Sequence, residues 1–189
     1  RIVAMAQSLG DRDLVATARF LLLGTMVEAG DLAGLDRELA ENAPLVAQFT
    51  GLHDNRHSSW FRTLRALLDG DTAAAAALLD QALTRAQAEN DPDALSVWGA
   101  QASLARWMSG DLAGIEPILR QATQLFPTDL IWTAALAWLW SKMGRHTAAS
   151  GLLTQVTDLS QIPRDRNWLA AIAIIAEVAA DLGDGPLME

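Results

Sequence analysis

A glycine-aspartate step recurs along this chain and constrains its fold more than any other feature. Five such steps, and one glycine-arginine step in an equivalent place, begin at positions 10, 30, 70, 110, 144 and 183. From Gly30 onward, successive step glycines are spaced about 34–40 residues apart, which is the period of a helical hairpin. The sequence therefore predicts pairs of helices stacked in a row.

The chemistry of the step suits the end of one helix and the start of the next. Glycine tolerates the left-handed conformation that follows a helix, and aspartate accepts hydrogen bonds from the free N–H groups of the following helix. Each aspartate cap contributes about 1 kcal/mol. Small residues follow the step, as in the alanine run that ends at Ala77, so the second helix is expected to lie close to the first.

The whole pattern predicts an all-α fold of about ten helices and no sheet, since no segment shows the period-two alternation of a strand. The predicted helices span residues 1–9, 12–28, 32–52, 57–69, 72–89, 93–108, 112–125, 128–142, 147–159 and 166–182. The second helix and every other helix after it are A helices that end at a glycine step; those between are B helices. We expect one right-handed superhelical α-solenoid of antiparallel pairs, forming a single tetratricopeptide-like domain over residues 1–189.

Four prolines bear on these boundaries. Pro44 and Pro117 fall inside predicted B helices, where an interior proline costs roughly 3 kcal/mol, so a kink or a restart is expected at each. Pro92 and Pro127 fall between predicted helices, where a fixed φ helps the chain to turn.

Charge and composition exclude several classes of function. A net charge of −9 argues against nucleic acid as a direct partner, because such affinity needs clustered basic residues. The chain has no cysteine, which excludes disulfides, thiolate metal ligands and cysteine nucleophiles. The longest apolar runs, 130–140 and 168–176, are shorter than the roughly 20 residues that span a bilayer. We expect a cytoplasmic protein without a membrane partner.

The two ends suggest a piece of a longer protein. The chain opens at Arg1 in apolar helical rhythm without a signal peptide, and residues 182–186 close one helix and prepare another. We therefore expect a fragment truncated at both ends. Apolar faces exposed on terminal repeats would allow a homodimer to form through them.

The residues also resemble a known family. The two Gly-Asp-Leu-Ala-Gly steps, the helix entry at Asp91-Pro-Asp-Ala94 and the segment from Ile162 to Leu169 before an alanine-rich helix resemble the tetratricopeptide-like repeat region of large actinobacterial regulators. In these regulators an ATP-binding signalling domain precedes the repeats, and some members carry a nucleotide-cyclase or LuxR-type DNA-binding domain. The present repeats are longer than the strict tetratricopeptide repeat, and the chain has no tyrosine for that consensus position.

The resemblance implies a superhelical arm that senses a ligand or binds a partner. The arm would transmit this signal to an ATPase and an output domain outside this chain. No ATP site is expected in the chain itself. A phosphate-binding loop needs glycines and a lysine at a helix start, whereas the only lysine, Lys142, is at a predicted helix end.

Seven tryptophans stand out in a chain without tyrosine. Four of them recur once per A helix, with about one repeat between neighbours: Trp60, Trp98, Trp132 and Trp168. We favour core packing between repeats, because a repeating core requires regular recurrence; the alternative is an aromatic ladder along a concave groove. Trp138 and Trp140 are two positions apart and cannot share a helix face, so at least one is expected near the surface.

Arginines near the A helices could line the same groove and bind carboxylates of a partner, since guanidinium pairs bidentately with carboxylate. The alternative is a set of solvated faces. The candidate interaction surface comprises Arg19, Trp60, Arg62, Arg65, Trp98, Arg106, Trp132 and Arg145.

Two polar segments have simpler interpretations. His53 and His57 have the spacing of helical metal ligands, but we interpret 51–57 as a loop that leads into a helix and find no third ligand, so no metal site is predicted. Arg164, Asp165 and Asn167 could form a recognition loop before Trp168. We favour Asp165 as an N-cap, with Arg164 pairing with a neighbouring repeat.

No catalytic set is evident. The chain lacks cysteine and a Gly-x-Ser-x-Gly motif, and His146 follows a turn without an evident partner. We predict that the chain is not an enzyme, holds no cofactor and serves as a protein-interaction module for another protein or for neighbouring domains. The alternative hypothesis is an effector-sensing domain, in which the tryptophan-rich groove binds a small molecule that controls a linked ATPase.

Overall fold

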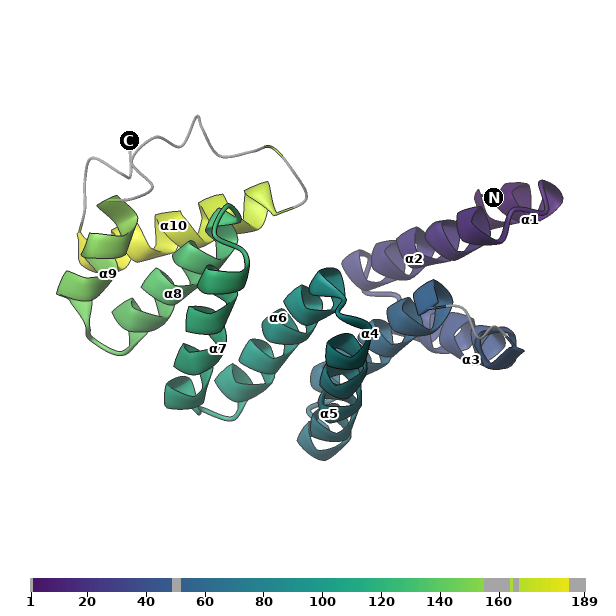
Figure 1. The fold of residues 1–189 in the computed structure, drawn as a ribbon, viewed down its shortest axis with the longest axis horizontal. Coiled ribbons are helices and arrows are strands. Elements are labelled where there is room, and N and C mark those ends of the chain that lie inside the picture. Colours follow the sequence, from purple (N-terminus) through teal and green to yellow (C-terminus); the bar gives the residue numbers. More distant parts are fainter. Residues whose placement is uncertain (1, 49–51, 155–163, 165–166, 184–189) are drawn as a thin grey trace. The chain divides into compact units, whose positions relative to one another are not determined.

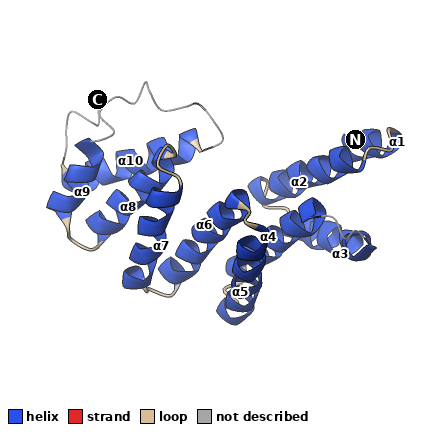
Figure 2. Cartoon of the chain, in the orientation of Figure 1, coloured by secondary structure: helices blue, strands red, loops and turns tan. Residues whose placement is uncertain are grey.

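The computed structural model describes residues 2–48, 52–154, 164 and 167–183, without the side chains of residues 12, 42–48 and 52–57. Within these residues every regular element is a helix and no strand is present, so the all-α prediction is confirmed (Figure 2). The helices are α1 (Ile2–Ser8), α2 (Arg12–Glu28), α3 (Leu32–Gln48), α4 (Leu52–Leu68), α5 (Thr72–Glu89), α6 (Pro92–Met108), α7 (Leu112–Leu125), α8 (Leu130–Lys142), α9 (His146–Leu153) and α10 (Trp168–Leu182).

The glycine steps terminate helices as predicted. All six step glycines adopt a left-handed conformation, with φ between +67° and +77°. At the step between α4 and α5, the N–H of Asp71 donates to the carbonyl of Ala66 at 3.0 Å, which closes the helix end. The Asp71 carboxylate then accepts from the N–H of Ala74 at 2.9 Å and caps α5. The same capping bond is made by Asp11, Asp31 and Asp111.

The turn between α5 and α6 has no glycine. Asn90 takes the left-handed place, with φ of +50°, a conformation that asparagine adopts more readily than most residues. The Asp91 carboxylate accepts from the N–H of Ala94 at 3.1 Å. Pro92 is therefore the first residue of α6 and does not lie between helices as predicted; its missing N–H needs no partner there. Pro127 does lie between two helices, α7 and α8.

One other predicted boundary is wrong. The predicted loop over 51–57 is occupied from residue 52 by the first turns of α4, because polar residues without glycine or proline do not by themselves interrupt a helix. Of the kink or restart predicted at Pro44 and Pro117, no restart occurs, since α3 and α7 each run through the proline as one helix; a kink stays a prediction. In α7, burial of Ile115, Ile118 and Leu119 around the proline offsets the lost hydrogen bond. The predicted end of the ninth helix, at residue 159, lies outside the described residues.

The chain divides into two compact units, residues 1–101 and 102–189. In the first unit α2 contacts both α3 and α4, and α4 contacts α5 (Figure 1). The core among α2, α3 and α4 is formed by Leu23, Leu35, Leu39 and Phe61. An A helix here thus contacts its own B helix and the next A helix.

In the second unit α8 is the central helix and contacts α7, α9 and α10 (Figure 1). Towards α7 the core is formed by Ile115, Leu119, Ala122, Trp132, Leu136 and Leu139. Towards α9 and α10 it is formed by Ala134, Ala137, Ala149, Leu153, Ile175 and Val178. Because alanine side chains are small, the helices on this second side can approach one another closely.

Candidate interaction surface

The residues of the predicted interaction surface fall in both units. Those of the first unit are Arg19, Trp60, Arg62, Arg65 and Trp98, and those of the second are Arg106, Trp132 and Arg145. Their environments range from exposed helix surface to buried core. Whether they act together as one surface stays a prediction.

Trp60 lines a shallow recess of the first unit. Its half-buried ring meets Phe20 edge to face, with ring centroids 6.3 Å apart and an interplanar angle of 76°. Its carbonyl oxygen accepts a hydrogen bond from Nε2 of Gln101 at 2.8 Å, which joins α4 to α6. The recess is lined by Ser59, Trp60, Ala82, Arg85, Ala86, Glu89 and Ala94.

The size of this recess limits what it can hold. Its volume is about 10 Å³, which is room for about one water molecule. Pockets for small ligands measure roughly 300–1,000 Å³. The recess beside Trp60 therefore suits a single projecting group of a larger partner better than an enclosed small molecule.

Arg65 ties two helices of the first unit together. Its Nε donates to Oδ1 of Asp36 at 2.9 Å and its Nη2 donates to Oδ2 at 3.3 Å, which joins α4 to α3. Its Nη1 pairs with Asp69, just beyond the end of α4. Hydrogen bonds to Asp69 and Asp36 raise the pKa of the Arg65 guanidinium, which stays charged. These contacts use the guanidinium within the fold.

The remaining residues of the first unit differ in exposure. Nε of Arg19 lies 3.9 Å from Oε1 of Glu38, an ion pair between partly buried side chains of α2 and α3. Arg62 is exposed on α4, and Trp98 is half-buried on α6. Arg62 is therefore the arginine of this set in the first unit that is best placed to meet a partner.

Trp132 is a core residue of the second unit. Its side chain is 5% exposed and its ring stacks with Phe126, with centroids 6.2 Å apart and an interplanar angle of 26°. Its buried indole Nε1 has no hydrogen-bond partner among the described residues. For Trp132 the core interpretation of the tryptophan series is therefore correct, whereas Trp60, Trp98 and Trp168 are half-buried.

Arg106 lies where α6 ends. Its Nε lies 3.7 Å from Oδ2 of Asp111, whose other oxygen caps α7. Both side chains are largely exposed, so screening by solvent makes this a weak ion pair.

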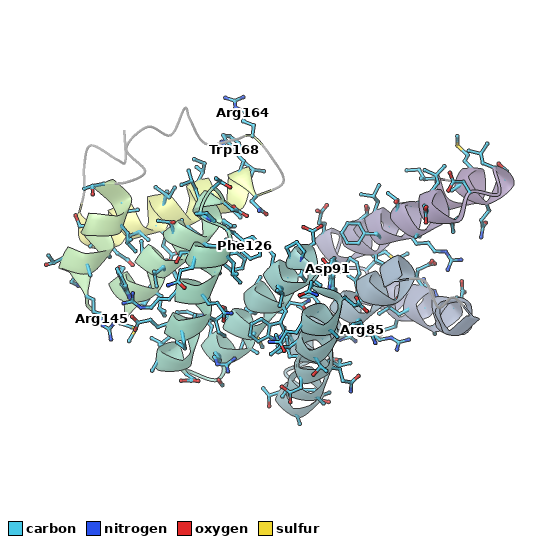
Figure 3. All side chains as sticks on the ribbon, in the orientation of Figure 1. Arg85, Asp91, Phe126, Arg145, Arg164 and Trp168 are labelled. Carbon is cyan, nitrogen blue, oxygen red and sulfur yellow. The ribbon has the colours of Figure 1, made fainter. Side chains whose placement is uncertain are left out.

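Arg145 belongs to a group of four side chains, named the Glu116 cluster: Glu116, Arg120, Trp140 and Arg145. The Glu116 carboxylate accepts from Nη1 of Arg145 at 2.8 Å, from Nε of Arg120 at 2.9 Å and from Nε1 of Trp140 at 3.1 Å. The Arg120 guanidinium also lies over the Trp140 ring, 4.9 Å from its centroid. The cluster joins α7, α8 and the turn before α9, where Figure 3 labels Arg145.

The donors around Glu116 keep it ionised. Partial burial raises the pKa of the Glu116 carboxyl, but hydrogen bonds from Trp140, Arg120 and Arg145 lower it by more. The net result is a pKa below the ordinary value. The two arginines thus have an anionic anchor at neutral pH.

A second group, named the Lys142 cluster, joins α8 to α10 and comprises Trp138, Ser141, Lys142, Glu177 and Asp181. Nζ of Lys142 lies 2.7 Å from Oδ2 of Asp181 and 2.8 Å from Oε1 of Glu177. Oγ of Ser141 donates to Oδ2 of Asp181 at 2.9 Å. Hydrogen bonds from Lys142 lower the pKa of both carboxyls, and those to Asp181 and Glu177 raise the pKa of Lys142.

Trp138 and Trp140 contact different neighbouring helices, in keeping with their spacing. Nε1 of Trp138 donates to Oε1 of Glu177 on α10 at 3.1 Å, whereas Trp140 donates to Glu116 on α7. The Trp138 ring also contacts Trp107 of α6, with centroids 4.5 Å apart. Both side chains are half-buried, so each has a packed ring and a polar tip near solvent.

The segment before α10 differs from the prediction. The N-cap of α10 is Asn167, and the predicted cap Asp165 lies outside the described residues. Nδ2 of Asn167 donates to Oδ2 of Asp129, the cap residue of α8, at 3.1 Å. The Arg164 guanidinium lies 5.2 Å from the ring centroid of Trp168 and so contacts its own segment. Figure 3 labels both residues.

The predicted absence of a metal site rests on His53 and His57, whose side chains lie outside the described residues. In the part of the chain that is described, no group of three His, Asp or Glu side chains could hold a metal ion. His146 is the first residue of α9.

Sequence reasoning missed the centre of the Glu116 cluster. Glu116 and Arg120 are four positions apart on α7, a spacing that predicts a helical ion pair. That signal could have been found. The contacts of Glu116 with Trp140 and Arg145, 24 and 29 positions away, carry no comparable local signal.

No protein-family model, curated protein or solved structure matches this chain. Within the described helices, none combines the length and the apolar character needed to cross a membrane. The resemblance to actinobacterial regulators therefore stays a prediction.

Proposed function

We propose that this chain is a helical repeat module that binds other proteins and carries out no chemistry itself. The observation that carries the proposal is the way successive repeats are joined. Side-chain hydrogen bonds connect residues about one repeat apart, from Gln101 to Trp60, from Asn167 to Asp129 and from Lys142 to Asp181. Stacked repeats of this kind present an extended surface, which suits a macromolecular partner.

The finer architecture is part of the proposal. Each unit has an A helix that contacts the next A helix, α2 with α4 and α8 with α10. Continued over the chain, this pattern supports a right-handed superhelical α-solenoid of the tetratricopeptide-like kind. The proposed setting is a cytoplasmic bacterial signalling or transcriptional regulator, in which the partner is another protein or a neighbouring domain.

The proposed contact region in the first unit surrounds Trp60. Arg62 on α4 and Arg85 on α5 are exposed, and Arg85 and Glu89 line the recess beside Trp60. Figure 3 labels Arg85. Tryptophan and arginine are enriched at surfaces that bind peptides and proteins.

The proposal is tested by selecting a random peptide library, displayed on phage, against the full chain. We expect related peptides to be enriched and to bind in solution, as measured by fluorescence anisotropy. Arg62→Glu and Arg85→Glu should weaken the peptides that bind near Trp60. Arg37→Glu is the matched control, because Arg37 is an exposed arginine of the same unit on α3.

Two results would count against this function. One is a library that yields no binding peptide. The other comes from a panel of small metabolites screened in parallel by tryptophan fluorescence. A metabolite that shifts the emission would favour the effector-sensing hypothesis.

A further inference from the structure

The Glu116 cluster shields its acidic centre and presents its basic groups to solvent. The Glu116 side chain is 17% exposed, whereas those of Arg120 and Arg145 are 54% and 48% exposed. One carboxylate is thus covered by two guanidinium groups. The three charged groups sum to +1, on a chain whose net charge is −9.

Both arginines keep donors for a further acceptor. A guanidinium has five N–H groups. Arg120 directs Nε and Nη2 to Glu116, and Arg145 directs Nη1 to it. The remaining N–H groups of both side chains have no other hydrogen-bond partner among the described residues, so they are available to a ligand.

The cluster is also ordered before any ligand binds. Arg120 is held between the Glu116 carboxylate and the face of the Trp140 ring, and Arg145 is held by the same carboxylate. Side chains that are already fixed lose less conformational entropy when they bind. An exposed arginine without such anchors would have to be ordered by the ligand itself.

The charge at position 145 is the reverse of the charge at the other steps. Where the steps at Gly30, Gly70 and Gly110 continue with aspartate, the step at Gly144 continues with Arg145. The replacement exchanges an internal capping carboxylate for an exposed cation, since the Arg145 side chain makes no capping hydrogen bond.

We propose that Arg120 and Arg145 bind a carboxylate side chain in an acidic segment of a partner protein. The proposal rests on the proposed protein-binding function and names the chemistry of one partner. Two guanidinium groups match the charge and the planar shape of a carboxylate. A short acidic segment needs only this local attraction, whereas an extended polyanion would meet the repulsion of the whole acidic chain.

The experiment measures the binding of a fluorescein-labelled peptide of alternating glutamate and alanine to the full chain by anisotropy. We expect saturable binding that weakens with added salt. Arg120→Gln and Arg145→Gln should each weaken it roughly tenfold, because each removes a charge-assisted hydrogen bond. Arg145→Lys, which keeps the charge, should lose less. Arg37→Gln, on an exposed arginine of α3 in the first unit, should bind as the wild type does.

Several outcomes would overturn the inference: no binding of the glutamate peptide, equal binding of a lysine-alanine peptide, or equal weakening by Arg37→Gln. Thermal unfolding of each variant identifies any loss that is due to unfolding, and Arg145→Lys keeps the test decisive if Arg145→Gln is unstable. If the phage library yields peptides whose binding is insensitive to Arg120→Gln and Arg145→Gln, the acidic-segment proposal fails while the protein-binding function stands. If the library yields none, the function itself fails.

Discussion

Nζ of Lys142 lies 2.7 Å from Oδ2 of Asp181, so the only lysine of the chain joins the end of α8 to the end of α10. The two residues are 39 positions apart, about one repeat. The same ammonium also contacts Glu177, one turn earlier on α10. One side chain therefore fixes the position of one A helix against the next.

Lys142→Met should destabilise the second unit slightly. The methionine keeps most of the apolar stem but leaves Glu177 and Asp181 without their shared cation. Because solvent screens these partly exposed groups, we expect Tm to fall by only a few degrees. Far-UV circular dichroism during heating measures it. Arg37→Met, on an exposed arginine of α3, is the control, and an equal Tm for both variants would contradict the prediction.

Stability should fall in acid through three carboxyls of the second unit. The pKa values of Glu116, Glu177 and Asp181 are lowered in the folded chain, so the folded form binds fewer protons than the unfolded form. Their stabilisation is present above the ordinary carboxyl values, 4.5 for glutamate and 3.8 for aspartate, and is lost as pH falls through the lower folded values.

The measurement is Tm as a function of pH, for the wild type and for Lys142→Met. The variant should show a shallower fall in acid, because hydrogen bonds from Lys142 are the largest cause of the lowered pKa of Glu177 and Asp181. Lys142 itself has a raised pKa, so its stabilisation is present below 10.5 and lost as pH rises through the higher folded value. If Tm falls with pH in the same way in the two proteins, the Lys142 cluster is not the origin of the acid sensitivity.

The helices could be predicted from the sequence because their ends are determined locally. Glycine at a left-handed position and aspartate at an N-cap act within one turn, so Gly70 and Asp71 identify a boundary without knowledge of the rest of the fold. Prediction failed where the local signal was weak. The start of α4 is predicted at residue 57 but lies at Leu52, because the polar residues 53–57 contain no glycine or proline that would interrupt a helix.

The contacts between repeats could not be predicted in the same way. Trp140 contacts Glu116 on α7 and Trp138 contacts Glu177 on α10, because both of these helices pack against α8. That arrangement depends on how the buried alanines and leucines pack, which the sequence period does not specify. The spacing of Trp138 and Trp140 predicts different faces but gives no partner for either one.

Gly144 and Gly151 should respond to the same substitution with opposite signs. Gly144 has φ of +73°, so Gly144→Ala should cost about 1–2 kcal/mol, because a Cβ disfavours the left-handed region. Gly151 is exposed within α9 and has open space at its Cβ position, so Gly151→Ala should stabilise by up to about 1 kcal/mol. Urea unfolding measures both. Gly144→Asn should cost less than Gly144→Ala, since Asn90 already occupies a left-handed position in this chain.

Asp71→Ala should show how much a step aspartate contributes to the fold. The Asp71 carboxylate accepts from the N–H of Ala74 at 2.9 Å, and its removal leaves the first N–H groups of α5 to water alone. We expect a loss of about 1 kcal/mol in the free energy of unfolding. Asp80→Ala is the matched control, because Asp80 is an exposed aspartate in the interior of the same helix, far from its first turn. If the two variants unfold at the same urea concentration, the recurring aspartate does not stabilise the helix starts, and its role in the repeat must lie in another interaction.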